Sequence, residues 1–125
     1  HYLHPLSKDL LLGVGILRSQ VEISLFDVST QSDALKVDSL LLDDQRYLDV
    51  FYDHQKITVT GNIILLEAGK DIIVLRLEQT NLVELGQVSS GRYSKEIMIY
   101  NDILNVFTDN SVKQYELREG VPEIK

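Results

Sequence analysis

Apolar and polar residues alternate along several short stretches of this chain. Val21–Leu25, Ile57–Thr60 and Ile73–Leu77 each follow a period of two. Such a period, combined with many β-branched residues, predicts pleated strands that turn one face toward a core. Two continuous apolar runs, Leu10–Val14 and Ile63–Leu66, are instead typical of strands that are covered on both faces.

Helical periodicity is weak throughout the chain. The nearest candidate, Leu35–Leu42, also fits a strand, and we predict a strand there. Gly13, Gly15 and Gly61 lie close to predicted strand interiors, where glycine indicates a bulge or a close approach of strands. Turn-forming residues separate the strands in four segments: Thr30–Asp33, Ala68–Asp71, Asn101–Asp102 and Thr108–Ser111. Roughly ten strands at spacings of about 8–12 residues indicate a sandwich, a barrel or a propeller.

A repeated spacing favours one of these architectures. Leu10, Ile57 and Ile103 begin similar strand patterns and are 47 and 46 residues apart. Propeller blades of four strands recur at roughly 40–50 residues. We therefore predict an all-β fold of antiparallel four-stranded β-propeller blades, with approximate blades at 1–45, 46–91 and 92–125 of a single segment. The alternative is a self-contained small β-barrel or sandwich that binds a ligand, although such a fold gives no reason for this spacing.

Composition limits the kinds of partner. The chain has 125 residues, of which 44% are hydrophobic and 25% charged, as in a globular protein. Its 12 Lys and Arg against 19 Asp and Glu give a net charge of −7, so we expect no nucleic-acid partner and no polybasic membrane surface. The absence of cysteine excludes disulfides and thiolate metal sites. The apolar runs are too short for membrane insertion.

Several motifs resemble one known family. His4–Leu6 with Leu10–Gly15, followed by Ile23–Ser29, is similar to the secreted β-propeller domain family of bacteria and archaea, in which an HP…LIGIG strand precedes an LSLFDVS strand. Tyr52–His54 resembles that family's YDHK element, and Arg92–Asn110 resembles its RSLYIGDVLYTVSDN blade. The resemblance implies a propeller fold, export from the cell and no catalytic motif. The chain does not begin with Met, and we expect it to be a mature or excised part of a longer protein.

Histidine is the first candidate for metal binding. His1, His4 and His54 are the only histidines, and His4 and His54 are separated by about one predicted blade. Equivalent positions of neighbouring blades lie side by side, so the two imidazoles could meet at a metal. An imidazole at a corner between turn and strand also satisfies backbone groups, and we predict this structural role for both residues.

Carboxylates are the second candidate. Asp43, Asp44 and Asp49, with Asp53 nearby, form an acidic segment of the kind that binds calcium. The segment lacks the D-x-[DN]-x-[DN]-G loop, so we predict a solvated turn and no metal or other cofactor. Paired carboxylates also serve glycoside hydrolases, but that chemistry depends on a separation that sequence does not define. No serine lies in a G-x-S-x-G elbow.

Aromatic residues are the remaining candidates. Exposed tyrosines contact protein or carbohydrate partners, whereas buried ones fill gaps between blades. Six aromatic residues precede or begin predicted blades: Tyr2, Tyr47, Phe51, Tyr52, Tyr93 and Tyr100. We predict a non-enzymatic, extracellular β-propeller segment that acts as a protein- or carbohydrate-interaction module, with part of a propeller glycoside hydrolase as an alternative. Three blades do not close a ring, so we expect further blades from the same chain or from a second copy.

Overall fold

A computed structural model describes residues 2–18, 20–30, 33–42, 57–89, 96–109, 111–117 and 123–124. Within these residues, twelve strands form three antiparallel sheets of four strands each. The first sheet comprises β1 (Tyr2–Pro5), β2 (Leu10–Leu17), β3 (Gln20–Asp27) and β4 (Leu35–Leu41). The second comprises β5 (Ile57–Thr60), β6 (Ile63–Ala68), β7 (Asp71–Glu78) and β8 (Asn81–Ser89). The third comprises β9 (Glu96–Tyr100), β10 (Ile103–Thr108), β11 (Ser111–Glu116) and β12 (Glu123–Ile124).

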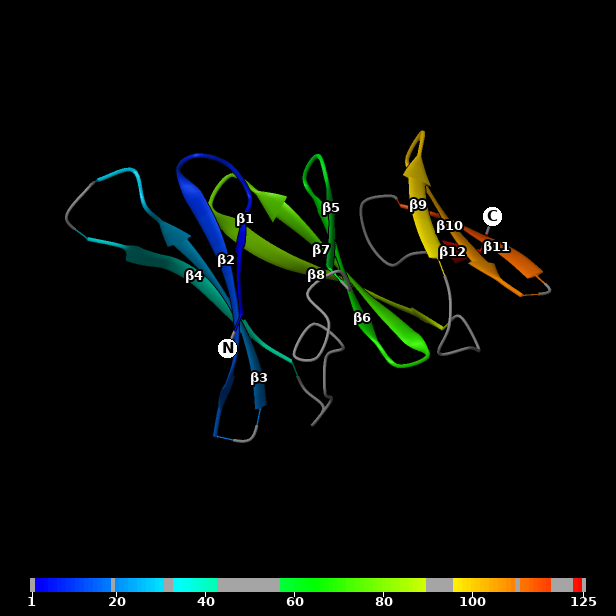
Figure 1. Cartoon of the computed structure of the whole chain (residues 1–125), viewed down its shortest axis with the longest axis horizontal. Coiled ribbons are helices and arrows are strands. Elements are labelled where there is room, and N and C mark those ends of the chain that lie inside the picture. Colours follow the sequence, from blue (N-terminus) through cyan, green and yellow to red (C-terminus); the bar gives the residue numbers. More distant parts are fainter. Residues whose placement is uncertain are drawn as a thin grey trace.

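The strands of each sheet follow chain order, and the three sheets lie side by side in chain order (Figure 1). Their faces pack against one another through two separate apolar clusters. One cluster joins the first sheet to the second, and the other joins the second sheet to the third. This arrangement of successive four-stranded sheets is that of propeller blades and confirms the predicted fold class. Because the described strands form three separate sheets, the single closed barrel or sandwich does not describe this molecule.

The second sheet explains one of the continuous apolar runs. In β6, Ile64 and Leu66 pack in the cluster shared with the first sheet, while Ile63 and Leu65 pack in the cluster shared with the third. Alternate side chains of a strand point to opposite faces, so the part of a strand that packs between two neighbouring sheets is apolar at successive positions. The run Leu10–Val14 differs, because the described residues cover only one face of its sheet.

The sheet pairing corrects the repeat that the sequence indicated. Leu10 and Ile103 begin the second strands of their sheets, whereas Ile57 begins the first strand of its sheet. The structural repeat is given by the equivalent second strands β2, β6 and β10. These strands end at Leu17, Ala68 and Thr108, which are 51 and 40 residues apart. The spacings of 47 and 46 residues between Leu10, Ile57 and Ile103 therefore arose from comparing a first strand with two second strands.

The turns agree with the sequence at several positions. Gly69, Asn101 and Asp102 have positive φ values of 64°, 51° and 61° in the predicted turns. Gly61, with a φ of 59°, lies in the turn between β5 and β6 and not inside a strand. Leu35–Leu41 is a strand, as predicted.

Candidate functional site: the outer faces of the first and third sheets

The first sheet has an outer face that is opposite to the second sheet. In β2, Leu12 and Val14 are buried against the second sheet, so Gly13 and its alternate neighbours lie on the other face. Gly13 pairs with Leu3 of β1 and Ser24 of β3. Directly opposed residues of antiparallel strands share a face, and these residues therefore form part of the outer face.

Gly13 lets an aromatic ring lie close to this face. A Cβ atom on Gly13 would lie 2.9 Å from Phe26 Cε2 and 3.5 Å from Leu3 Cδ2, so the missing side chain makes room for the aromatic ring. A groove of about 250 Å³ lies on the first sheet. Its lining residues are Leu3, Gly13, Val14, Gly15, Ile16, Leu17, Glu22, Ser24, Phe26 and Lys36. The sequence indicated a bulge or a close approach of strands at Gly13, whereas the pairing is regular there and the group that lies close to Gly13 is a side chain.

The charged lining residues of the groove neutralise each other. Lys36 Nζ lies 3.1 Å from Glu22 Oε2. Leu3, at the apolar part of the groove, is 59% exposed. An apolar floor with a charged pair at its side has the composition of a protein-contact surface, in which the centre is apolar and the rim is polar.

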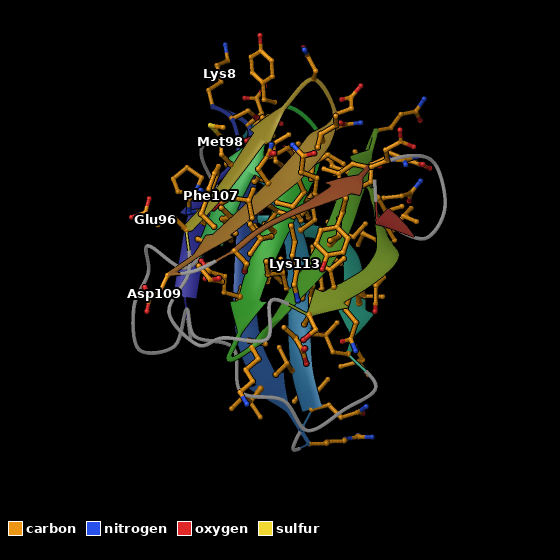
Figure 2. The ribbon with its side chains drawn as sticks, turned by 90° about the vertical axis from the view of Figure 1, so that its right-hand side faces the viewer. Lys8, Glu96, Met98, Phe107, Asp109 and Lys113 are labelled. Carbon is orange, nitrogen blue, oxygen red and sulfur yellow. The ribbon has the colours of Figure 1, made fainter. Side chains whose placement is uncertain are left out.

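The third sheet also has an outer face, on the side away from the second sheet. Figure 2 looks onto this sheet and shows Met98 and Phe107 on it. Phe107 pairs with Val112 of β11 and with Glu96 of β9. Met98 is 50% exposed and Val112 58%, and both are unusually open for large apolar side chains in strands.

The exposed large apolar residues of the described part of the chain have a common location. They are Leu3, Ile16, Leu17, Leu35, Val37, Leu41, Met98, Tyr100, Phe107 and Val112. All of them belong to the first and third sheets, and the second sheet, which has a neighbour on each face, contributes none. On the third sheet, Met98, Tyr100, Phe107 and Val112 lie on the outer face, whereas on the first sheet Leu3 lies on the outer face and Ile16 lies on the same face as Val14.

A buried amide lies within the outer face of the third sheet. Asn105 is only 7% exposed, and its Oδ1 accepts a hydrogen bond from Gln114 Nε2 at 2.8 Å. Its Nδ2 donates to the carbonyl oxygens of Met98 at 3.4 Å and Ile103 at 3.2 Å. The amide is thus satisfied inside its own sheet and does not demand a partner.

Among the described residues, two hydrogen bonds that involve side chains join neighbouring sheets. The backbone N–H of Leu82 in β8 donates to Asp38 Oδ2 of β4 at 2.6 Å. The hydroxyl of Tyr115 in β11 donates to the carbonyl oxygen of Ser89 in β8 at 3.0 Å. Burial raises the pKa of Tyr115 above its ordinary value. These bonds fix the sheets relative to one another in addition to the apolar contacts.

The family-like SLFDVS motif has a structural role at the end of β3. The backbone N–H of Ser29 donates to Asp27 Oδ1 at 2.8 Å, and hydrogen bonding by Ser29 lowers the pKa of Asp27. The N–H of Val28 donates to the carbonyl oxygen of Asp9 at 2.8 Å. The motif therefore ends the strand in a turn that is stabilised by a side chain.

Most of the candidate metal ligands fall outside the part of the chain that the structure describes: His1, Asp43, Asp44, Asp49, Asp53 and His54. His4 lies within β1, opposite Leu12, and not at a corner between turn and strand. Among the described residues, no group of three or more His, Cys, Asp or Glu side chains is placed to hold a metal ion.

The aromatic candidates divide in the same way. Tyr100 ends β9 and is 65% exposed. Tyr2 begins β1, but its side chain lies outside the description, as do four whole residues: Tyr47, Phe51, Tyr52 and Tyr93. Sequence reasoning missed the aromatic residues that matter in the structure, Phe26, Phe107 and Tyr115. Their alternation within strands was the available signal, but the face that each one occupies depends on strand register.

The comparison with family models agrees with this geometry. The model described as "Beta propeller domain" matches residues 1–63, which is half of the chain. The chain therefore belongs to the beta propeller domain family. The match covers the first sheet and β5, so the resemblance over Arg92–Asn110 lies beyond it and stays a prediction. Searches of curated proteins and of solved structures find no match. Within the described residues, no helix is long and apolar enough to span a membrane.

Proposed function

We propose that this chain is a non-enzymatic, extracellular propeller segment that acts as a protein-interaction module, and that its two outer faces bind further blades. The observation that carries the proposal is the apolar groove beside Leu3, Gly13 and Phe26 on the outer face of the first sheet. Extracellular location is inferred from the resemblance to secreted propeller proteins.

A protein sheet suits these faces better than a carbohydrate. Sugars are bound through several free polar groups that fix their hydroxyls. In the groove, Lys36 and Glu22 are paired with each other, and the remaining walls are mostly apolar. Full burial of a Leu or Phe side chain contributes about 1.5–3 kcal/mol, so covering Leu3 and Phe26 provides a substantial driving force for docking.

The proposal is tested by placing a charge on the groove. Leu3→Glu puts a carboxylate in the apolar surface, while Thr80→Glu adds the same charge to an exposed turn of the second sheet as a control. We expect the unmodified chain and Thr80→Glu to associate as concentration rises, and Leu3→Glu to associate at least tenfold more weakly, because an unpaired charge resists burial. Sedimentation velocity measures the association, and circular dichroism checks the fold. Monomeric unmodified chain at every concentration would contradict the proposal.

A further inference from the structure

We propose that the protein face that docks on the third sheet presents arginine among apolar side chains, and that Phe107 and Glu96 together receive an arginine of this partner. The inference rests on the proposed function, in which the outer faces bind further blades, and it specifies the chemistry of the partner at one of them. It is carried by the charges and the exposed ring on the outer face of the third sheet.

The pairing of the strands defines which residues share this outer face. Leu104 and Val106 of β10 are buried in the cluster shared with the second sheet. Phe107, the next residue along the strand, therefore points to the outer face. Glu96 of β9 lies directly opposite Phe107, and opposed residues of antiparallel strands share a face. The ring and the carboxylate thus belong to the same surface.

The charges on this surface have one sign. Among the described residues of β9, β10 and β11, Glu96 and Glu116 are the charged residues of the outer face. Lys113 is the only lysine or arginine in these three strands, and it pairs with Val106. Lys113 therefore belongs to the face that is turned toward the second sheet. The outer face of these strands is apolar and anionic.

Glu96 and Phe107 are placed to act on one group of a partner. Directly opposed residues have Cβ atoms about 4.5–5.5 Å apart. The side chain of Glu96 is exposed, and Phe107 is 38% exposed. Asp109, which is also exposed, lies in the turn that follows β10, at the same end of the sheet (Figure 2). An exposed ring beside carboxylates fits a cation that also makes apolar contacts.

The groove on the first sheet differs in this respect. Its Lys36 and Glu22 already form an ion pair of 3.1 Å, so it has no need of a charged partner. The ion pairs within the described part of the chain are this one and Arg76–Glu78, and neither involves Glu96. With a net charge of −7 for the whole chain, an anionic partner is repelled and a cationic one attracted.

Arginine satisfies both parts of this surface better than lysine does. Its guanidinium is planar, stacks on aromatic rings and is weakly hydrated, while its fork of N–H donors fits a carboxylate. The compact ammonium of lysine is strongly hydrated and loses more on leaving water. Met98 and Val112, which are 50% and 58% exposed on the same face, take the apolar side chains of the partner.

An NMR titration of the isotope-labelled chain tests this chemistry. The probe is a short synthetic peptide in which threonine alternates with leucine and arginine in turn, so that one face of the extended peptide carries both. Matched peptides contain lysine or glutamate in place of arginine. We expect amide shift changes centred on Glu96, Phe107 and Val112, with the arginine peptide bound most tightly and the glutamate peptide least. Added salt is expected to weaken the binding, because it screens exposed charges.

Variants separate the ring from the carboxylate. Glu96→Gln and Phe107→Leu are each expected to weaken binding of the arginine peptide by about two- to fivefold, the effect of one exposed ion pair or one exposed cation–π contact. Glu84→Gln is the control, because it removes the same charge from an exposed position of β8 in the second sheet. It is expected to leave binding unchanged. Circular dichroism checks the fold of each variant.

Several outcomes would overturn the inference. Shift changes spread over the whole surface, with equal losses in Glu96→Gln and Glu84→Gln, would mean that general charge attracts the peptide. Equal affinity for the arginine and lysine peptides would exclude the assignment to arginine, and the lack of any shift change would exclude the surface itself. The proposed function is judged separately by the association of the unmodified chain and Leu3→Glu, because that test reports on the groove of the first sheet.

Discussion

At the scale of single residues, polar side chains hold neighbouring sheets together. The sheets meet through apolar clusters, which are strong but lack direction. Tyr115 and Asp38 add hydrogen bonds that are directional, and each one crosses from one sheet to the next. Both side chains bind backbone groups of β8, the last strand of the second sheet. They thereby provide hydrogen-bond partners for two backbone groups of β8, the N–H of Leu82 and the carbonyl oxygen of Ser89.

Tyr115 predicts a loss of stability at alkaline pH. Burial raises its folded pKa above the ordinary value near 10, so the folded state retains the proton more tightly than the unfolded state. The stabilisation is therefore complete below about pH 10 and is lost as the pH rises through the higher folded pKa. Near neutral pH, Tyr115→Phe is expected to lower the free energy of unfolding by about 1 kcal/mol, because the hydrogen bond to Ser89 is lost.

Urea unfolding near neutral pH and above pH 10 measures this effect. The deficit of Tyr115→Phe relative to the unmodified chain is expected to shrink at the higher pH, since the variant has no phenol to ionise at this position. Tyr100→Phe serves as the control, because its side chain is exposed and removing its hydroxyl breaks no described bond between sheets. A deficit that stays constant with pH would show that ionisation of Tyr115 does not act on stability.

Asp38 predicts a second measurable contribution. Its carboxylate accepts a short hydrogen bond from Leu82, and bonds to charged groups are worth about 1.5–3 kcal/mol. We expect Asp38→Ala to lower the free energy of unfolding by about 1–2 kcal/mol, and Asp38→Asn by less, because an amide oxygen also accepts. Asp33→Ala, at an exposed position before β4, is the control. Equal urea midpoints for Asp38→Ala and Asp33→Ala would exclude the contribution.

At the scale of elements, the second sheet is the structural centre of the chain. Its two middle strands, β6 and β7, place alternate side chains in the two different clusters. Destabilisation of this sheet therefore affects both contacts at once, whereas the outer sheets each share one cluster. The continuous apolar sequence of β6 and β7 is a direct consequence of this position.

A pair of leucines tests this difference between elements. Leu75 of β7 is fully buried in the cluster shared with the first sheet, whereas Leu35 of β4 is 58% exposed. Leu75→Ala is expected to lower the free energy of unfolding by about 2–5 kcal/mol, because it removes buried atoms and leaves a cavity. Leu35→Ala is expected to change it by about 0.5 kcal/mol or less. Chemical denaturation compares the two, and similar losses would mean that the second sheet is not the core described.

At the scale of the whole molecule, the main feature is the pair of outer faces, on the first and third sheets, that no described sheet covers. A propeller removes free edges and faces by closing on itself, and three sheets side by side leave two faces for something else to cover. With a net charge of −7, the chain resists unspecific association, so docking must rely on matched surfaces and not on general attraction. The apolar groove on the first sheet and the exposed apolar residues of the third sheet are the surfaces that the proposal assigns to this docking.

The amino-acid sequence by itself determined the strands and the class of fold. Alternation, turn residues and the SLFDVS motif act within a few neighbouring residues, and local signals of this kind are readable along a chain. The repeat was misaligned, because short apolar strands look alike in the sequence until their hydrogen-bond partners are known.

Only the tertiary structure decided which residues line the groove on the first sheet. A shift of register by one residue moves every side chain of a strand to the opposite face, so the alternation in β2 alone does not say that Gly13 faces outward beside Phe26. Likewise, Tyr115 and Ser89 are 26 residues apart, and only the packing of one sheet on the next brings the hydroxyl to the carbonyl. Local patterns built the sheets, whereas contacts between distant residues defined which faces the described residues bury and which they leave exposed.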